Sequence, residues 1–82
     1  MKLTEARAGQ KGIITEMHGD ARFISRITSI GLTLGCPIEV LQNEKKQPML
    51  VYGRDTMVAI NREECEKIEI EDVKKWPEKK KQ

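Results

Sequence analysis

Only one segment of this chain carries the spacing of an amphipathic helix, and both of its ends are marked. In residues 21–30 the large apolar side chains recur three or four positions apart, at Phe23, Ile24, Ile27 and Ile30. Asp20 precedes this stripe as a helix N-cap, and Gly31 follows it at the position where many helices end on glycine. The spacing therefore predicts one helix of three turns, and the rest of the chain has to fold differently.

The other apolar runs are four or five residues long and are separated by glycine, proline or polar turn signals. They predict strands at Ile13–Met17, Ile38–Gln42, Met49–Tyr52, Thr56–Ile60 and Lys67–Ile70. Asn61, with Glu64 three residues later, resembles a capping box and predicts a helical turn over Arg62–Glu66. So small a sheet leaves exposed edges unless it closes on itself. We therefore predict a mainly β fold, a five-stranded SH3-like barrel with one short α-helix and a helical turn.

The charge is unevenly distributed along the 82 residues, which suffice for one domain. We place that domain at residues 1–71 and expect residues 72–82 to be a disordered, lysine-rich tail. Residues 72–82 hold five lysines and two acids, whereas residues 1–71 hold ten bases and eleven acids. The formal net charge of +2 therefore comes from the tail. A nucleic-acid-binding domain is expected to carry a basic face on its folded part, so this pattern disfavours that function.

Sequence signals for export are missing. The N-terminal residues MKLTEARAGQKG lack the apolar run of a secretory signal, and no stretch approaches the roughly 20 apolar residues that span a bilayer. Cys36 and Cys65 are far apart and form no CxxC pair, and two unpaired thiols fit a reducing compartment. We expect a cytoplasmic protein.

The sequence offers little for catalysis or metal binding. It contains neither a phosphate-binding GxxxxGK[ST] motif nor a GxSxG motif, so we predict no enzyme activity and no cofactor. His18 is the only histidine, and its nearest donors in the sequence are Glu16 and Asp20, which is too few for a ferrous iron site. We predict no metal site, and we expect Cys36 and Cys65 to be inert, since the glutamates around Cys65 raise the pKa of a thiol.

The helix and the turn after it are the best candidates for a docking surface. Arg22 and Arg26 are four positions apart on the polar side of the helix, and the leucines of the following turn offer apolar anchors. Arginine and large apolar side chains are the usual hot spots of small interfaces. We predict a partner-binding surface made of Arg22, Arg26, Ile27, Gly31, Leu32 and Leu34.

The stretch SIGLTLGCPIEVLQ, followed by PMLVYGRDTMVAINREECEKIEIE, resembles the ferrous-iron transport protein A (FeoA) family. GQKGIITEM near the N-terminus also fits, so the resemblance covers about Leu3 to Glu71. The family often has Met-Gly-Leu at positions 30–32 and Pro-Gly at 34–35, where this chain has Ile-Gly-Leu and Leu-Gly. The resemblance implies an SH3-like barrel that binds or regulates the cytoplasmic GTP-binding region of a FeoB-type ferrous-iron transporter.

Two other functions are compatible with such a barrel. It could bind nucleic acid, with the lysine-rich tail as the motivating feature. It could also be a metal-responsive regulatory module, because the same barrel is the C-terminal domain of iron-dependent repressors. Fold alone does not separate these functions.

Overall fold

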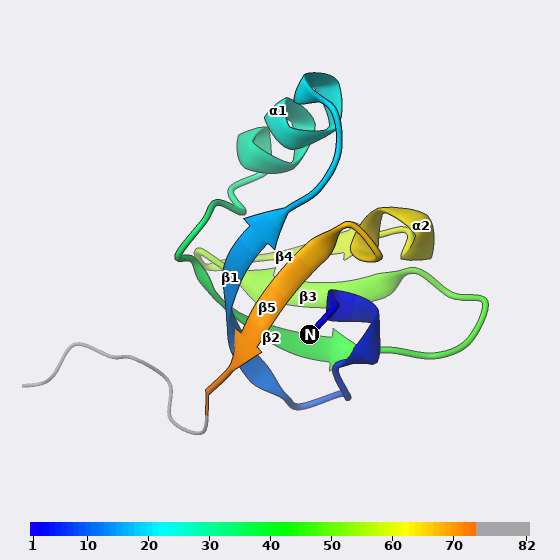
Figure 1. Ribbon diagram of the computed structural model, residues 1–82. Helices are drawn as coiled ribbons and strands as arrows, with labels where there is room; N and C mark the ends of the chain where they lie inside the picture. Colours follow the sequence, from blue (N-terminus) through cyan, green and yellow to red (C-terminus); the bar gives the residue numbers. More distant parts are fainter. Residues whose placement is uncertain (74–82) are drawn as a thin grey trace, which may run out of the picture.

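Five antiparallel strands form one sheet in the computed structural model, which describes residues 1–73 (Figure 1). The strands are β1 (Lys11–Met17), β2 (Pro37–Gln42), β3 (Met49–Gly53), β4 (Thr56–Ile60) and β5 (Ile68–Asp72). A 3-10 turn, η1 (Leu3–Glu5), and two helices, α1 (Ala21–Ser29) and α2 (Arg62–Cys65), complete the fold. The predicted five strands, single helix and helical turn are all present.

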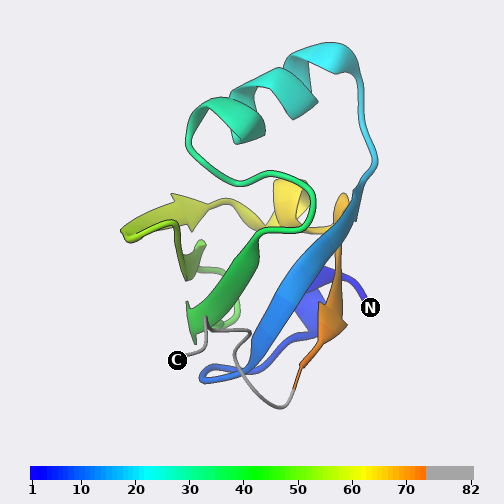
Figure 2. The same cartoon turned by 90° about the vertical axis from the view of Figure 1, so that its left-hand side faces the viewer.

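The strand order β4-β3-β2-β1-β5 places β1 inside the sheet, between β2 and β5, and leaves β4 and β5 at the two edges. The register shifts near Thr15 in β1 and near Leu41 in β2, and bulges of this kind bend a strand. Figures 1 and 2 show the resulting curled sheet, with α2 carrying the chain from β4 at one edge to β5 at the other. The short helix therefore connects the two edges of the curled sheet.

The concave side of the sheet encloses the core. Alternating positions of β2 and β3 are buried, so Ile38 and Val40 face inward with Val51 while Glu39 and Tyr52 face outward. Within residues 1–73 the buried side chains are all apolar: Leu3, Ala6, Ile14, Phe23, Ile27, Leu32, Cys36, Ile38, Val40, Met49, Val51, Ile60, Cys65, Ile68 and Ile70. Each fully buried aliphatic side chain contributes about 1.5–3 kcal/mol, so burial rather than polar contact stabilises this domain.

The ends of β1 and β5 differ from the sequence prediction because the two strands extend each other by pairing. β1 begins at Lys11 rather than Ile13, because Gly12 pairs with Ile38 on one side and with Asp72 on the other. A Cβ atom at Gly12 would lie 2.9 Å from the carbonyl oxygen of Glu71, so glycine permits this close approach. β5 in turn runs to Asp72, one residue into the predicted tail. Val73 is also described, and the remaining tail residues, 74–82, lie outside the described residues.

The segment before β1 also has structure that its pattern did not predict. Leu3 and Ala6 are buried beside the sheet, and Lys2 forms an isolated bridge with Glu69.

Within residues 1–73, no helix combines the length and the apolar character needed to cross a membrane.

Candidate functional site

Helix α1 follows β1 and is capped as its sequence predicts. The Asp20 carboxylate accepts a hydrogen bond from the Phe23 amide at 2.9 Å, which satisfies one of the free donors of the first turn. At the other end Gly31 has a φ of +104°, and the Leu32 amide donates to the Ile27 carbonyl at 3.3 Å. The chain therefore leaves the helix in a defined direction and turns back toward the sheet.

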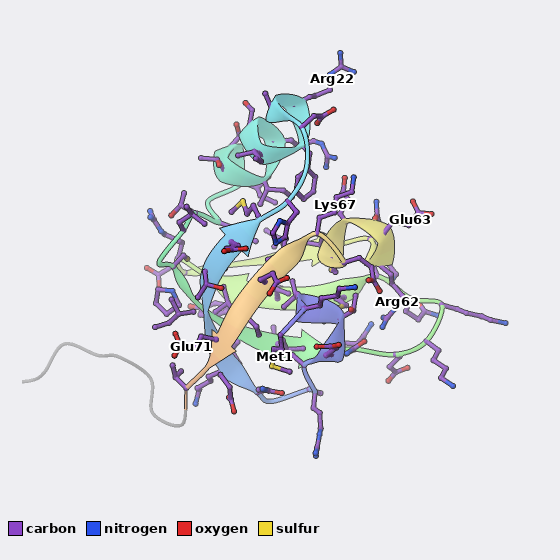
Figure 3. All side chains as sticks on the ribbon, in the orientation of Figure 1. Met1, Arg22, Arg62, Glu63, Lys67 and Glu71 are labelled. Atoms are coloured by element: carbon purple, nitrogen blue, oxygen red, sulfur yellow. The ribbon has the colours of Figure 1, made fainter. Side chains whose placement is uncertain are left out.

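Side-chain contacts fix α1 above the sheet, where it projects from the body of the molecule (Figures 1 and 2). Phe23 and Ile27 are buried in the core. Arg26 donates to the carboxylate of Glu64 on α2, and the Lys67 ammonium lies 5.1 Å from the centre of the Phe23 ring. Figure 3 shows Lys67 pointing toward α1. Core contacts therefore hold the apolar side of α1, and the contact with α2 holds its polar side.

Two of the predicted docking residues belong to the core. Ile27 and Leu32 are each 1% exposed, so they cannot contact a partner in the folded protein. Leu32 turns inward after Gly31 and packs near Gly53, whose missing Cβ leaves room for the leucine side chain. The prediction that these two residues contact a partner is therefore wrong, and both are core residues.

The remaining predicted residues also differ from one another. Arg26 is exposed, but its guanidinium is already paired with Glu64, and this pair holds the pKa of the Glu64 carboxyl below its usual value. Arg22 is exposed and points away from the body of the protein (Figure 3). Leu34 is 64% exposed, the highest value among the large apolar side chains of residues 1–73. Gly31 contributes its backbone conformation.

The fold adds two residues that the sequence did not suggest. Ile30, the C-cap of α1, is 38% exposed, although its spacing assigned it to the buried stripe. Arg54, in the β3–β4 turn, donates to the Thr33 hydroxyl at 3.2 Å and so lies beside the turn after α1. We call Arg22, Ile30, Leu34 and Arg54 the α1-turn surface. It combines two apolar side chains with two cations.

His18 has one of its two suggested neighbours, Glu16, but Glu69 takes the place of Asp20. Its Nε2 atom lies 3.0 Å from an oxygen of Glu16 and 3.4 Å from an oxygen of Glu69, whereas Asp20 caps α1. Both carboxylates address the same imidazole nitrogen, and all three side chains are at least one-third exposed. Residues 1–73 contain no group of three or more His, Cys, Asp or Glu side chains arranged to hold a metal ion.

Both cysteines are buried, free thiols. Burial raises the pKa of Cys65 to about 12, with a smaller upward contribution from Glu64 and Glu66 and an opposing one from Arg62. The sequence had suggested the glutamates as the cause, but desolvation is the larger effect. A thiol with this pKa is a poor nucleophile and a poor metal ligand at neutral pH.

The model of the FeoA domain family matches residues 1–72 of this chain. The chain belongs to the FeoA family. A crystal structure of an iron uptake regulatory protein (FeoA) superposes with a TM-score of 0.85 at 25% identity, covering 89% of this chain and 97% of that one. A comparison with curated proteins finds no match. The predicted family is confirmed, and with it a connection to ferrous iron transport.

More distant structures support the fold alone. FeoA from Stenotrophomonas maltophilia, solved with zinc and described as an SH3 domain protein, has a TM-score of 0.73 at 17% identity, covering 87% of this chain and 89% of that one. A manganese-dependent transcriptional repressor has a TM-score of 0.82 at 19% identity, but this chain covers only 41% of it. The SH3-like fold is confirmed, and it is shared with proteins of another function.

Proposed function

We propose that this FeoA-family protein is a cytoplasmic accessory protein of bacterial ferrous-iron uptake, which docks onto a FeoB-type membrane GTPase and modulates it. It acts by contact and has no enzyme activity of its own. The family membership supports the role in iron transport, and one similar structure is an iron uptake regulatory protein. Residues 1–73 hold ten bases and twelve acids, a balance that does not favour nucleic acid as the partner.

The observation that carries the docking proposal is the α1-turn surface. Leu34 and Ile30 present apolar area that the core leaves exposed, Arg54 lies beside the turn that follows α1, and Arg22 is exposed near the start of the helix. Because small interfaces combine a desolvated apolar anchor with arginine, this surface fits an apolar patch bordered by carboxylates. We expect such a patch on the cytoplasmic GTP-binding region of the transporter.

The test is a titration of the full-length, isotope-labelled chain with that cytoplasmic region, followed by amide chemical shifts. Binding should perturb α1 and the turn after it. Replacing Leu34 by Ser together with Arg22 by Glu should weaken binding by about 2 kcal/mol or more, the range of a small interface hot spot. Leu41→Ser is the matched control, since Leu41 is also an exposed leucine but lies on β2.

The two parts of the proposal fail separately. If the double variant binds as the unmodified chain does, the α1-turn surface is wrong and the shift map locates the true one. If the unmodified chain does not bind the GTP-binding region at all, the proposed partner is wrong.

A further inference from the structure

A second exposed apolar surface lies on the convex side of the sheet, separate from α1. Tyr52 on β3 pairs directly with Met57 on β4 and with Glu39 on β2, so the three side chains share one face. Tyr52 is 37% exposed and Met57 57% exposed, and Leu41, two residues after Glu39, is 40% exposed. We call Glu39, Leu41, Tyr52 and Met57 the outer face.

The described part of the chain ends in line with this face. The Val73 amide donates to the Lys11 carbonyl at 3.1 Å, and Lys11 pairs with Glu39, which pairs with Tyr52. Val73, Lys11, Glu39 and Tyr52 are therefore cross-strand neighbours in one row, which runs from the end of β5 across β1 and β2 to β3. Strands lie about 4.8 Å apart, so Tyr52 is about 14 Å from Val73.

The next residues of the sequence are long enough to cover that distance. Lys74, Lys75 and Trp76 follow Val73, and three extended residues span about 10 Å, to which the indole adds several more. Trp76 is the only tryptophan of the chain. Its side chain can therefore reach the outer face without any rearrangement of residues 1–73.

Charge favours the same contact. Residues 74–82 hold five lysines and one glutamate, whereas residues 1–73 hold ten bases and twelve acids. Glu39 lies within the outer face, and Glu71 lies near the end of β5, where Figure 3 places it at the rim of the sheet. The lysines on both sides of Trp76 are opposite in charge to these carboxylates, although Lys11 on β1 lies in the same row as Glu39.

We propose that the outer face is a docking surface for a basic segment with an aromatic side chain, and that residues 74–82 of the same chain supply it. The Trp76 indole covers the apolar side chains, and the lysines lie near Glu39 and Glu71. A short tether gives an effective concentration of about a millimolar, so even a weak contact is populated. The outer face is separate from the α1-turn surface, so the inference does not depend on the proposed function.

The single tryptophan provides the test in the full-length chain. Acrylamide quenching of Trp76 fluorescence should be weaker than that of N-acetyltryptophanamide. The substitutions Leu41→Gln and Met57→Gln together should raise the quenching constant roughly twofold, as expected for release of a tethered contact. Leu34→Gln is the matched control, because it makes the same kind of change at another exposed leucine, on the α1-turn surface, and it should leave the quenching constant unchanged.

Two results would overturn the proposal. Quenching of Trp76 equal to that of the free analogue means that the segment does not occupy the outer face. Protection that disappears on dilution means that the occupant is a second copy of the chain. Circular dichroism of each variant confirms that the fold is retained, since all three substituted side chains are exposed.

Discussion

Arg26 on α1 donates a hydrogen bond to the carboxylate of Glu64 on α2, and so joins two helices whose paired residues are 38 positions apart in the chain. Glu64 also donates its backbone amide to the side chain of Asn61, the N-cap of α2. The helix that carries the α1-turn surface is therefore fixed to the turn that connects the two edges of the sheet. The orientation of the proposed docking surface depends on this pair.

The Arg26–Glu64 pair predicts an acid-dependent loss of stability. The pKa of Glu64 is lowered in the folded protein, chiefly by the hydrogen bond from Arg26, from an unfolded value of about 4.3. A lowered folded pKa stabilises the protein above pH 4.3, and this contribution is lost as the pH falls through the folded value. Glu64→Gln should therefore lower the free energy of unfolding slightly at pH 7 and flatten its pH dependence below pH 5, measured by urea denaturation.

Glu63→Gln is the control for this experiment, because Glu63 is exposed on the same short helix. Both variants remove one negative charge, so a general charge effect would change them alike. If the free energy of unfolding falls in the same way below pH 5 in both variants, the Arg26–Glu64 pair does not cause the acid-dependent loss of stability.

Leu32 and Leu34 are separated by one residue, and we expect their replacement by alanine to have very different effects on stability. Leu32 is 1% exposed and Leu34 is 64% exposed. Leu32→Ala should lower the free energy of unfolding by about 2–5 kcal/mol, as for other buried leucines. Leu34→Ala should change it by less than about 0.5 kcal/mol. Chemical denaturation of the two variants tests this difference in the free energy of unfolding. Equal destabilisation would mean that Leu32 and Leu34 are not buried and exposed as described.

The buried thiol of Cys65 predicts an alkaline loss of stability. Its pKa is about 12 in the folded protein, whereas an unfolded cysteine ionises near 8.5. A raised folded pKa means that the stabilisation is complete below about pH 8.5 and is lost between that value and pH 12. Within this range, ionisation of the thiol should lower the free energy of unfolding by about 1.4 kcal/mol per pH unit. Cys65→Ala should abolish this contribution to the pH dependence.

Thiol labelling gives an independent measurement of the same burial. Iodoacetamide at pH 8 should modify neither cysteine of the folded protein, since Cys36 is also only 3% exposed, and should modify both in urea. Rapid labelling of Cys65 under native conditions would contradict its position in the core.

Local signals explain what the sequence could predict. The helix was correctly bounded because Asp20 and Gly31 act on adjacent backbone groups, and β4 was predicted to the residue because turns precede and follow it. Contacts distant in sequence explain what it could not. The length of β1 depends on Asp72, and the structure of η1 depends on the burial of Leu3 beside the sheet.

The proposed α1-turn surface contains only Arg22 and Leu34 of the predicted docking residues, and contacts distant in sequence explain this difference too. Helical spacing identified Arg22 as exposed, but the inward turn of Leu32 depends on the space above Gly53, and the partner of Arg26 comes from α2. Arg54 has a φ of +55° in a tight turn, and only the completed β3–β4 hairpin brings it to Thr33. No spacing rule relates these positions.

We expect the conservative substitution Arg62→Lys to destabilise the fold more than the same substitution at an exposed arginine such as Arg7. Its guanidinium donates to the carbonyls of Glu44 and Gln47 at 2.9 and 3.2 Å and to the Asn43 side chain at 2.7 Å. Asn43 in turn donates to the carbonyls of Thr4 and Ala6 at 3.1 and 2.6 Å. The β2–β3 loop, α2 and the N-terminal segment are thus joined through two side chains.

Lysine cannot replace this arginine, because an ammonium group lacks the planar fork that addresses three acceptors at once. Arg62→Lys should lower the free energy of unfolding by about 1–3 kcal/mol, the range for charged hydrogen bonds, whereas Arg7→Lys on the exposed surface should have little effect. In a double-mutant cycle with Asn43→Ala, the two losses should be less than additive by about 0.5–3 kcal/mol, because each removes the same contact. Full additivity in urea denaturation would mean that Arg62 and Asn43 stabilise the fold independently.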